Sequence, residues 1–376
     1  MYLDTIEKNR KYTFLNKYAF LKTPKTIMIP FYAILIMNIV CSYSYSNRVF
    51  YPLVLKQCIS VFISIIIFHI IVSININIIR RFAYVFIVIS FLSLIAVILF
   101  GKHIMGASRW LNFGFISVQP SEFTKIAIIL AVSKFLGNIS IKKIYRISST
   151  FITFSLIAPI LILIAKQPDL ATAVIIFITV VIMLFSVGKP KIEFIFAAIA
   201  SCIVAPITWI KFLKDYQKLR IINFIFPNND PLSSGYSVIQ SKIAIGSGGL
   251  FGKGYLNGTQ GKMNFLPENR TDFIFSIFSE EFGFFIELIL IFCYLSIVLY
   301  GLHASNKTNS IFCKLTAIGC SSLIFFHVFV NIGMTIGLLP VVGIPLIMMS
   351  YGGSSLLTGV ICVALIVNIG VNKNNV

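Results

Sequence analysis

Apolar runs of about 20 residues recur along almost the whole chain, and they limit its fold more than any other feature. Of the 376 residues, 58% are hydrophobic and 11% are charged, whereas soluble proteins have about 25% charged residues. The runs are continuous rather than alternating, and only a helix satisfies its own backbone groups in lipid. The sequence therefore predicts an all-α polytopic membrane protein.

The hydrophobic pattern predicts about ten transmembrane helices and one large extracytoplasmic loop. The loop, residues 214–270, lies between the seventh and eighth helices, and a shorter outer loop covers residues 102–120. No repeat or low-complexity linker divides the chain. We expect a basic cytoplasmic N-terminus over 1–25 and a single transmembrane domain over 26–376. The predicted spans lie near 26–46, 52–74, 82–101, 121–137, 148–165, 170–187, 192–213, 271–300, 311–338 and 350–371.

Basic residues predict the orientation of the chain in the cytoplasmic membrane. The positive-inside rule places both termini in the cytoplasm, and the first span is expected to act as its own targeting signal, since no cleavage motif precedes it. The net charge of +19 is typical of polybasic loops beside anionic lipid, or of a protein with a polyanionic substrate. We expect no nucleic-acid partner. The residues expected inside are Lys8, Arg10, Lys11, Lys17, Lys22, Lys25, Arg80, Arg81, Lys142, Lys143, Arg146, Lys189, Lys191 and Lys373.

Cysteine and histidine give no sign of a metal site or a disulfide framework. The seven cysteines are scattered, mostly within predicted helices, and form no CxxC pair. None of the four histidines lies at ligand spacing to another histidine or to a cysteine. We therefore expect the cysteines to be small hydrophobic residues and predict no His/Cys metal site.

Four of the twelve acidic residues lie within FLPENRTDFIFSIFSEEFGFF, residues 265–285. Asp272 is the most unusual of them, because it stands where a polar segment gives way to an apolar helix and a buried carboxylate is costly there. Ser276 and Ser279 continue its helix face at spacings of four and seven. The carboxylate is predicted either to cap the helix or to carry a function.

Two shorter motifs place charged residues at helix starts. In QPSEFTK, residues 119–125, Glu122 and Lys125 project from one helix face, either as an intrahelical ion pair or with Lys125 meeting a substrate phosphate. In KQPDLAT, residues 166–172, Asp169 either caps the following helix or contributes to a polar site.

Two glycine-rich segments interrupt the hydrophobic pattern. GSGGLFGKG, residues 246–254, is not a Walker A loop, because Ser247 and Gly254 stand where that motif needs Gly and Ser or Thr. It predicts tight turns with close backbone approach, although its amides could bind an anion. GLLPVVGIPLIMMSYGGSS, residues 337–355, predicts either a re-entrant segment beside a substrate route or a simple outer turn.

These segments together resemble a known family. GASRWLNFG, VQPSEFTK, QPDLAT, GYSVIQSKIAIGSGGLFGKG, FLPENRTDFIF, LPVVGIPL and SYGGSS are similar, in this order, to the signature segments of the SEDS membrane glycosyltransferases. The resemblance covers residues 101–359 and is closer to the RodA-like elongation type than to the FtsW-like division type.

The resemblance implies a peptidoglycan glycosyltransferase that polymerises lipid II on the outer face of the membrane, maintains rod shape and works with a class B penicillin-binding protein. It places the essential aspartate on Asp272 and the other substrate-binding residues on Trp110, Glu122, Lys125 and Asp169. The alternatives are a division-type polymerase, a lipid II flippase or a scaffold of the wall-synthesis complex.

The implied reaction turns an α-linked diphosphate donor into a β-linked product by one inverting displacement. Inversion needs a base beside the acceptor and stabilisation of the leaving group on the other side. Asp272 is the expected base. Lys125 is the first candidate to meet the diphosphate, followed by Arg109 and Lys242. No cofactor is certain, although Mg²⁺ or Mn²⁺ could share that task.

Overall fold

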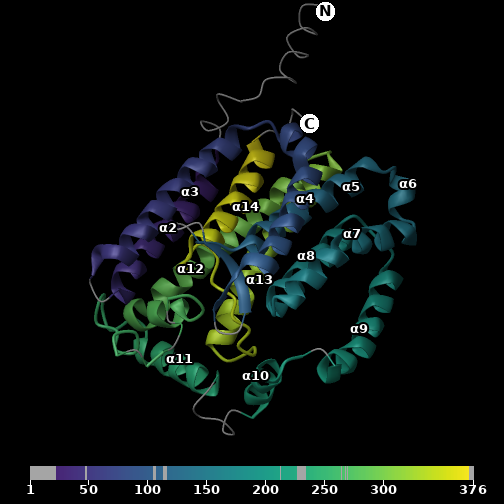
Figure 1. The fold of residues 1–376 in the computed structure, drawn as a ribbon. Coiled ribbons are helices and arrows are strands. Elements are labelled where there is room, and N and C mark those ends of the chain that lie inside the picture. The colour runs from purple at the N-terminus through teal and green to yellow at the C-terminus, as the bar shows by residue number, and fades with distance from the viewer. Residues whose placement is uncertain are drawn as a thin grey trace, which may run out of the picture.

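The computed structural model is a bundle of helices with one small sheet (Figure 1). It describes residues 23–46, 49–104, 107–112, 117–211, 213–226, 234–263, 265–266, 268 and 270–371. The predicted cytoplasmic lysines and arginines at 8, 10, 11, 17, 22 and 373 therefore lie outside the described residues. The long helices are α2 (Lys25–Tyr45), α3 (Leu55–Ser73), α4 (Ile76–Phe100), α5 (Pro120–Asn138), α7 (Ile147–Lys166), α8 (Leu170–Ser186), α9 (Lys191–Lys211), α12 (Ile274–Asn306), α13 (Ile311–Thr335) and α14 (Gly353–Val371).

A helix lies at each of the ten predicted spans. Seven of the described helices are long and apolar enough to cross a membrane, counting η2 (Phe50–Val54) and α3 as one. The helices α5, α8 and α9 do not meet that criterion, and α8 is apolar but only 17 residues long. The polytopic helical fold is therefore confirmed, while the count of ten stays a prediction.

The two predicted outer loops contain regular structure that the sequence did not predict. Three short antiparallel strands in the order β1–β2–β3 occupy the first loop: β1 (Lys102–Ile104), β2 (Ala107–Asn112) and β3 (Ser117–Val118). The second loop contains α10 (Asp215–Ile225) and α11 (Ser234–Gly248). The short α6 (Ile141–Ile144) joins α5 to α7.

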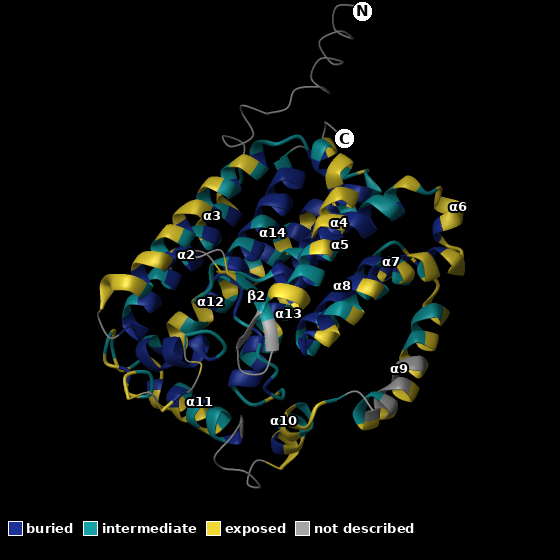
Figure 2. Cartoon of the chain, in the orientation of Figure 1, coloured by how far each residue is buried: buried dark blue, intermediate teal, exposed yellow. Residues whose placement is uncertain are grey.

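The centre of the bundle is formed by α13 and α14. Most residues of both helices are buried, and α13 packs against α5, α8, α12 and α14. The surrounding helices α3 and α4 instead carry many exposed residues (Figure 2). Their exposed large apolar side chains include Phe62, Phe82 and Val88. A helix that is apolar on its outer face as well as its inner face is typical of a protein surrounded by lipid.

The glycine run of residues 246–254 begins as the last residues of α11 and continues as tight turns packed on a kink in α12. Gly283 breaks α12 with a φ of 74°, and a Cβ on Gly252 would lie 2.1 Å from the carbonyl oxygen of Glu281. The amides of Lys253 and Gly254 donate to the carbonyls of Glu280 and Glu281 at 2.9 and 3.1 Å. These amides therefore supply hydrogen bonds to carbonyls beside the break in α12. The close backbone approach agrees with the prediction from the sequence.

The segment between α13 and α14 is irregular and buried in protein. Leu346, Ile347 and Met348 are fully buried without being helical. Asn38 of α2 donates to the carbonyls of Met348 and Met349 at 3.1 and 2.8 Å. Such backbone is tolerated at membrane depth only when protein groups satisfy it. The segment is thus irregular and packed in protein, and its place beside a substrate route stays a prediction.

The ends of several helices meet at one end of the bundle. Asn368 of α14 donates to the carbonyls of Ile71, Val72 and Ile74 between α3 and α4. Arg80 at the start of α4 donates to Asn138 at the end of α5 at 2.6 Å. Figure 1 shows α10 and α11 at the opposite end from the C-terminus.

Candidate active site

Asp272 lies two residues before the start of α12 and does not cap it. The N-cap is Phe273, and no side chain makes a capping hydrogen bond there. The capping alternative is therefore wrong. Ser276 and Ser279, on the predicted polar face of α12, are both buried, and the Ser276 hydroxyl lies 2.6 Å from that of Ser241 in α11. This polar face thus joins α12 to α11.

The backbone around Asp272 is held by α13 and by the irregular segment. Asn331 donates to the carbonyl of Asp272 at 2.8 Å and to that of Ile344 at 2.7 Å. The Ser350 hydroxyl donates to the carbonyl of Thr271 at 2.6 Å. These bonds fix the position of a carboxylate that belongs to a turn, which is the precision that acid and base chemistry needs.

The surroundings of Asp272 favour its neutral form. Burial raises the pKa of its carboxyl to about 6, and the carboxylate of Glu268 adds to the increase, while Arg220 and Arg109 oppose it. A Cβ on Gly343 would lie 3.4 Å from Oδ2 of Asp272 and 3.7 Å from a guanidinium nitrogen of Arg220. A carboxyl with a pKa close to neutral pH is suited to take a proton in the course of a reaction.

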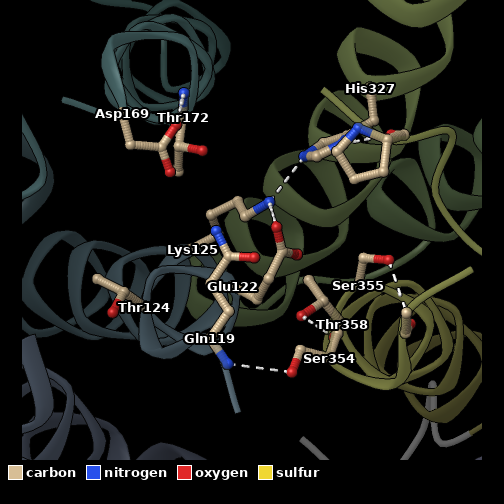
Figure 3. A network of polar contacts seen from close by, with 12 residues as sticks. Gln119, Glu122, Thr124, Lys125, Asp169, Thr172, His327, Ser354, Ser355 and Thr358 are labelled. Atoms are coloured by element: carbon tan, nitrogen blue, oxygen red, sulfur yellow. Dashed lines mark hydrogen bonds and ion pairs between the residues drawn. The ribbon is translucent and has the colours of Figure 1, made fainter. Parts of the chain in front are cut away.

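A second polar cluster joins α5 to α13 (Figure 3). The Lys125 ammonium donates to Oε1 of Glu122 at 2.8 Å, and its Nζ lies 2.9 Å from Nε2 of His327. All three side chains are buried, and Oε2 of Glu122 has no hydrogen-bond partner. The intrahelical pair expected from the sequence is present. Direct contact between Lys125 and a substrate stays a prediction.

The loop between α7 and α8 is held by Arg109. Its guanidinium donates from Nε to the carbonyl of Gln167 at 3.2 Å and also donates to that of Pro168. The carboxylate of Asp169 accepts from the amide of Thr172 at 3.4 Å, so it caps α8 as one alternative expects (Figure 3). Trp110 follows Arg109 in β2 and is half-buried.

Lys242 is exposed on α11. With Arg220 of α10 it lines a cavity that the segment after α13 closes. Among the predicted site residues, Lys125 thus pairs with Glu122, Arg109 holds the loop before Asp169, and Asp272 and Lys242 lie on either side of Arg220.

Sequence reasoning missed Arg220, His327 and Asn331. The two residues of α13 carried a usable signal, because His327, Asn331 and Thr335 follow at intervals of four in an apolar span, and polar residues there usually serve a function. Arg220 carried none, since it was one of several basic residues in a segment expected to be a loop.

Metal ligation was also left open by the sequence. Among the described residues, no three His, Cys, Asp or Glu side chains gather where they could hold a metal ion. Because Mg²⁺ is often bound by one or two carboxylates together with substrate phosphates, a divalent cation that helps to stabilise the diphosphate stays a prediction.

Comparisons with known proteins agree with this architecture. The chain is 42% identical to the peptidoglycan glycosyltransferase MrdB of Escherichia coli over 72% of either chain, and 40% identical to MrdB of Helicobacter pylori over 84% of this chain and 82% of that one. RodA of Treponema pallidum is 33% identical over 73% of this chain and 79% of its own.

Solved structures show the same fold at lower identity. A chain of a peptidoglycan synthase complex matches with a TM-score of 0.81 and 24% identity, over 94% of this chain and 99% of that one. The rod shape determining protein RodA of Thermus thermophilus matches with a TM-score of 0.70 and 23% identity, over 94% and 98%. The family model for FtsW, RodA and SpoVE, described as cell cycle proteins, matches residues 19–375. The chain therefore belongs to the FtsW, RodA and SpoVE family.

Proposed function

We propose that this protein is the elongation-type peptidoglycan glycosyltransferase of its cell, which polymerises lipid II and maintains rod shape. The elongation type is favoured because the MrdB relatives reach 42% and 40% identity, whereas an FtsW of Tolumonas auensis reaches 33%. The geometry of Asp272 carries the proposal, since a fixed, partly buried carboxyl with a pKa of about 6 suits a general base.

In the proposed reaction, Asp272 accepts the proton of the acceptor sugar hydroxyl. The oxygen forms the new bond to the anomeric carbon of the donor while the bond from that carbon to the diphosphate breaks, and the electron pair leaves with the diphosphate. Because attack and departure occur on opposite faces, the configuration inverts in one step. Trp110, Glu122, Lys125, Asp169 and Arg109 are proposed to shape the substrate cavity around this centre.

The site is proposed to face the outside of the cytoplasmic membrane, with both termini in the cytoplasm. A class B penicillin-binding protein is the proposed partner, which would crosslink the strands. The fold match to a chain of a peptidoglycan synthase complex supports such a partnership.

Polymerisation of lipid II by the purified chain with its partner tests the proposal. Wild type should form glycan strands, and Asp272→Asn should slow polymerisation at least about a hundredfold, the lower end of the effect of a general base. Asp272→Glu should recover little, because the longer side chain moves the carboxylate out of attack geometry. Asp215→Asn, an exposed acid at the start of α10, is the matched control and should polymerise normally.

The same assay separates the alternatives. A flippase or a scaffold would form no glycan bonds, so absence of polymer from well-folded wild type would reject the enzyme. Equal rates for wild type and Asp272→Asn would leave the enzyme in place and reject Asp272 as its base.

A further inference from the structure

A cavity of about 60 Å³ lies between α10, α11 and the segment after α13. Its polar lining consists of Arg220, Asn223 and Lys242, and its apolar lining includes Val238, Ile239 and Val341. A water molecule needs about 10 to 15 Å³ of such space. The cavity therefore has room for a group the size of a few waters, such as a phosphoryl group.

The two cations of this cavity differ from the other predicted diphosphate ligands. Lys125 is buried, with its ammonium already bonded to Glu122 and His327. The Arg109 guanidinium donates to two backbone carbonyls. By contrast, neither Arg220 nor Lys242 forms a salt bridge with a described residue. The Arg220 charge acts on the Asp272 carboxylate at longer range, so both side chains can still bind an anion.

Arg220 also borders Asp272. Its guanidinium and Oδ2 of Asp272 both lie against Gly343. Gly343 has a φ of +74°, a conformation that glycine adopts readily because it has no side chain. An inverting transfer needs the base and the leaving-group site to be neighbours without being the same place. The arrangement of Asp272, Arg220 and the cavity meets that requirement.

We propose that this cavity is a diphosphate subsite, in which Arg220 and Lys242 bind the diphosphate of a lipid-linked donor. Arg220 is suited to bind two phosphate oxygens through its planar guanidinium, and Lys242 adds a second charge from the exposed face of α11. Val238, Ile239 and Val341 supply apolar contact for the first carbons of the lipid. The inference rests on the proposed function, and it assigns the leaving group to Arg220 and Lys242 instead of Lys125.

Calorimetric titration of the purified full chain with geranyl diphosphate tests the subsite without requiring turnover. Wild type should bind it saturably and more tightly than inorganic pyrophosphate, because the prenyl carbons add apolar contact. Arg220→Gln and Lys242→Gln should each weaken binding about tenfold or more, since each removes a charge-assisted contact. Lys218→Gln makes the same change of charge on α10 outside the cavity and should bind as wild type does.

Each arm has an outcome that overturns the inference. Wild-type affinity in Lys242→Gln would reject the subsite, and because Lys242 is exposed, this variant keeps the test valid even where Arg220→Gln fails to fold. Equal affinity for pyrophosphate and geranyl diphosphate would reject the lipid contact. Absence of polymer from a wild type that binds geranyl diphosphate through Arg220 and Lys242 would reject the proposed function alone. Unchanged binding in both variants of a polymerising enzyme would reject the subsite alone.

Discussion

The carboxylates around the start of α12 have unlike surroundings. Oε1 of Glu280 accepts from the Lys253 ammonium at 2.7 Å and from the amide and hydroxyl of Thr259 at 2.9 and 2.8 Å. Glu281 accepts from Ser44 of α2. A carboxylate held by this many donors stabilises the fold around it. Asp272 has no comparable set of donors among the described residues and faces Arg220 instead, so the two inner glutamates are expected to affect folding more than turnover.

The raised pKa of Asp272 predicts the pH dependence of the reaction. A base must be ionised, so kcat/KM should rise with pH through about 6, the pKa of Asp272, and should be lost below it. Because Glu268 contributes to the raised pKa, Glu268→Gln should move this rise of kcat/KM, the acidic limb of the pH profile, to lower pH without abolishing activity. Initial rates of polymerisation from pH 5 to 8 measure both effects. A limb that does not move in Glu268→Gln would contradict the assignment.

The buried pair of Glu122 and Lys125 predicts a loss of stability that a second change reverses. Lys125→Met leaves the Glu122 carboxylate buried without its cation, which costs roughly 3–5 kcal/mol. Glu122→Gln combined with Lys125→Met removes both charges and should recover most of that loss. Unfolding of the detergent-solubilised variants measures the difference.

Kinetics of the double variant decide between the two interpretations of Lys125. If Lys125 only completes a buried ion pair, the double variant should regain the wild-type KM for lipid II together with its stability. If Lys125 binds the diphosphate as the sequence suggested, KM should stay raised in a stable protein.

At the scale of elements, sequence reasoning succeeded where one physical rule dominated. Continuous hydrophobicity predicted a helix at each of the ten spans, because lipid permits little else. It failed for α10 and α11, where glycines and prolines suggested a loop. The helix α11 depends on long-range contact instead: Ser241 meets Ser276, and a Cβ on Gly248 would lie 2.2 Å from the carbonyl oxygen of Ser279.

The candidate site was only partly predictable from the sequence, because local patterns reveal some of its residues and not others. Asp272 stood out as an acid at the edge of an apolar run, and the family resemblance supplied its role. Arg220 comes from an element 52 positions earlier in the chain, and Asn331 from one 59 positions later. No local pattern brings such residues together, because the turn at Gly343 that joins Arg220 to Asp272 is a product of tertiary packing.

The contact between the glycine turn and α12 predicts that an added methyl group destabilises the fold at Gly252 but not at Gly246. Gly252→Ala places a Cβ against the backbone of Glu281 at a φ of +80°, so both strain and overlap should reduce the yield of folded protein severely. Gly246→Ala adds the same methyl group within α11, where nothing lies within 4 Å. It should be neutral or stabilise by about 1 kcal/mol through helix propensity. Size-exclusion yield and thermal unfolding in detergent measure the contrast, and similar behaviour of the two variants would contradict it.

At the scale of the whole molecule, one group of basic residues and the candidate active site lie at opposite ends of the bundle. The basic residues Arg80 and Arg81 begin α4 where the end of α14 docks. Lys189 reaches the carbonyl of Arg146 at 2.8 Å, which gathers the basic residues around α6 and α7. The cavity of Arg220 and Lys242 lies with α10 and α11 at the far end from the C-terminus (Figure 1). Such separation suits an enzyme anchored by anionic lipid on one side that acts on the other.

This polarity predicts where reporters will be found. A reporter fused after residue 376 should lie in the cytoplasm, because α14 ends beside the basic start of α4. One inserted near residue 229, between α10 and α11, should lie outside, and one inserted between Lys142 and Lys143 should lie inside. Paired fusions to alkaline phosphatase and green fluorescent protein measure this, since the first is active only outside and the second fluoresces only inside. An external C-terminus would mean that one helix does not cross the membrane. The first candidate is α8, because its 17 residues are at the lower limit for spanning the hydrocarbon core.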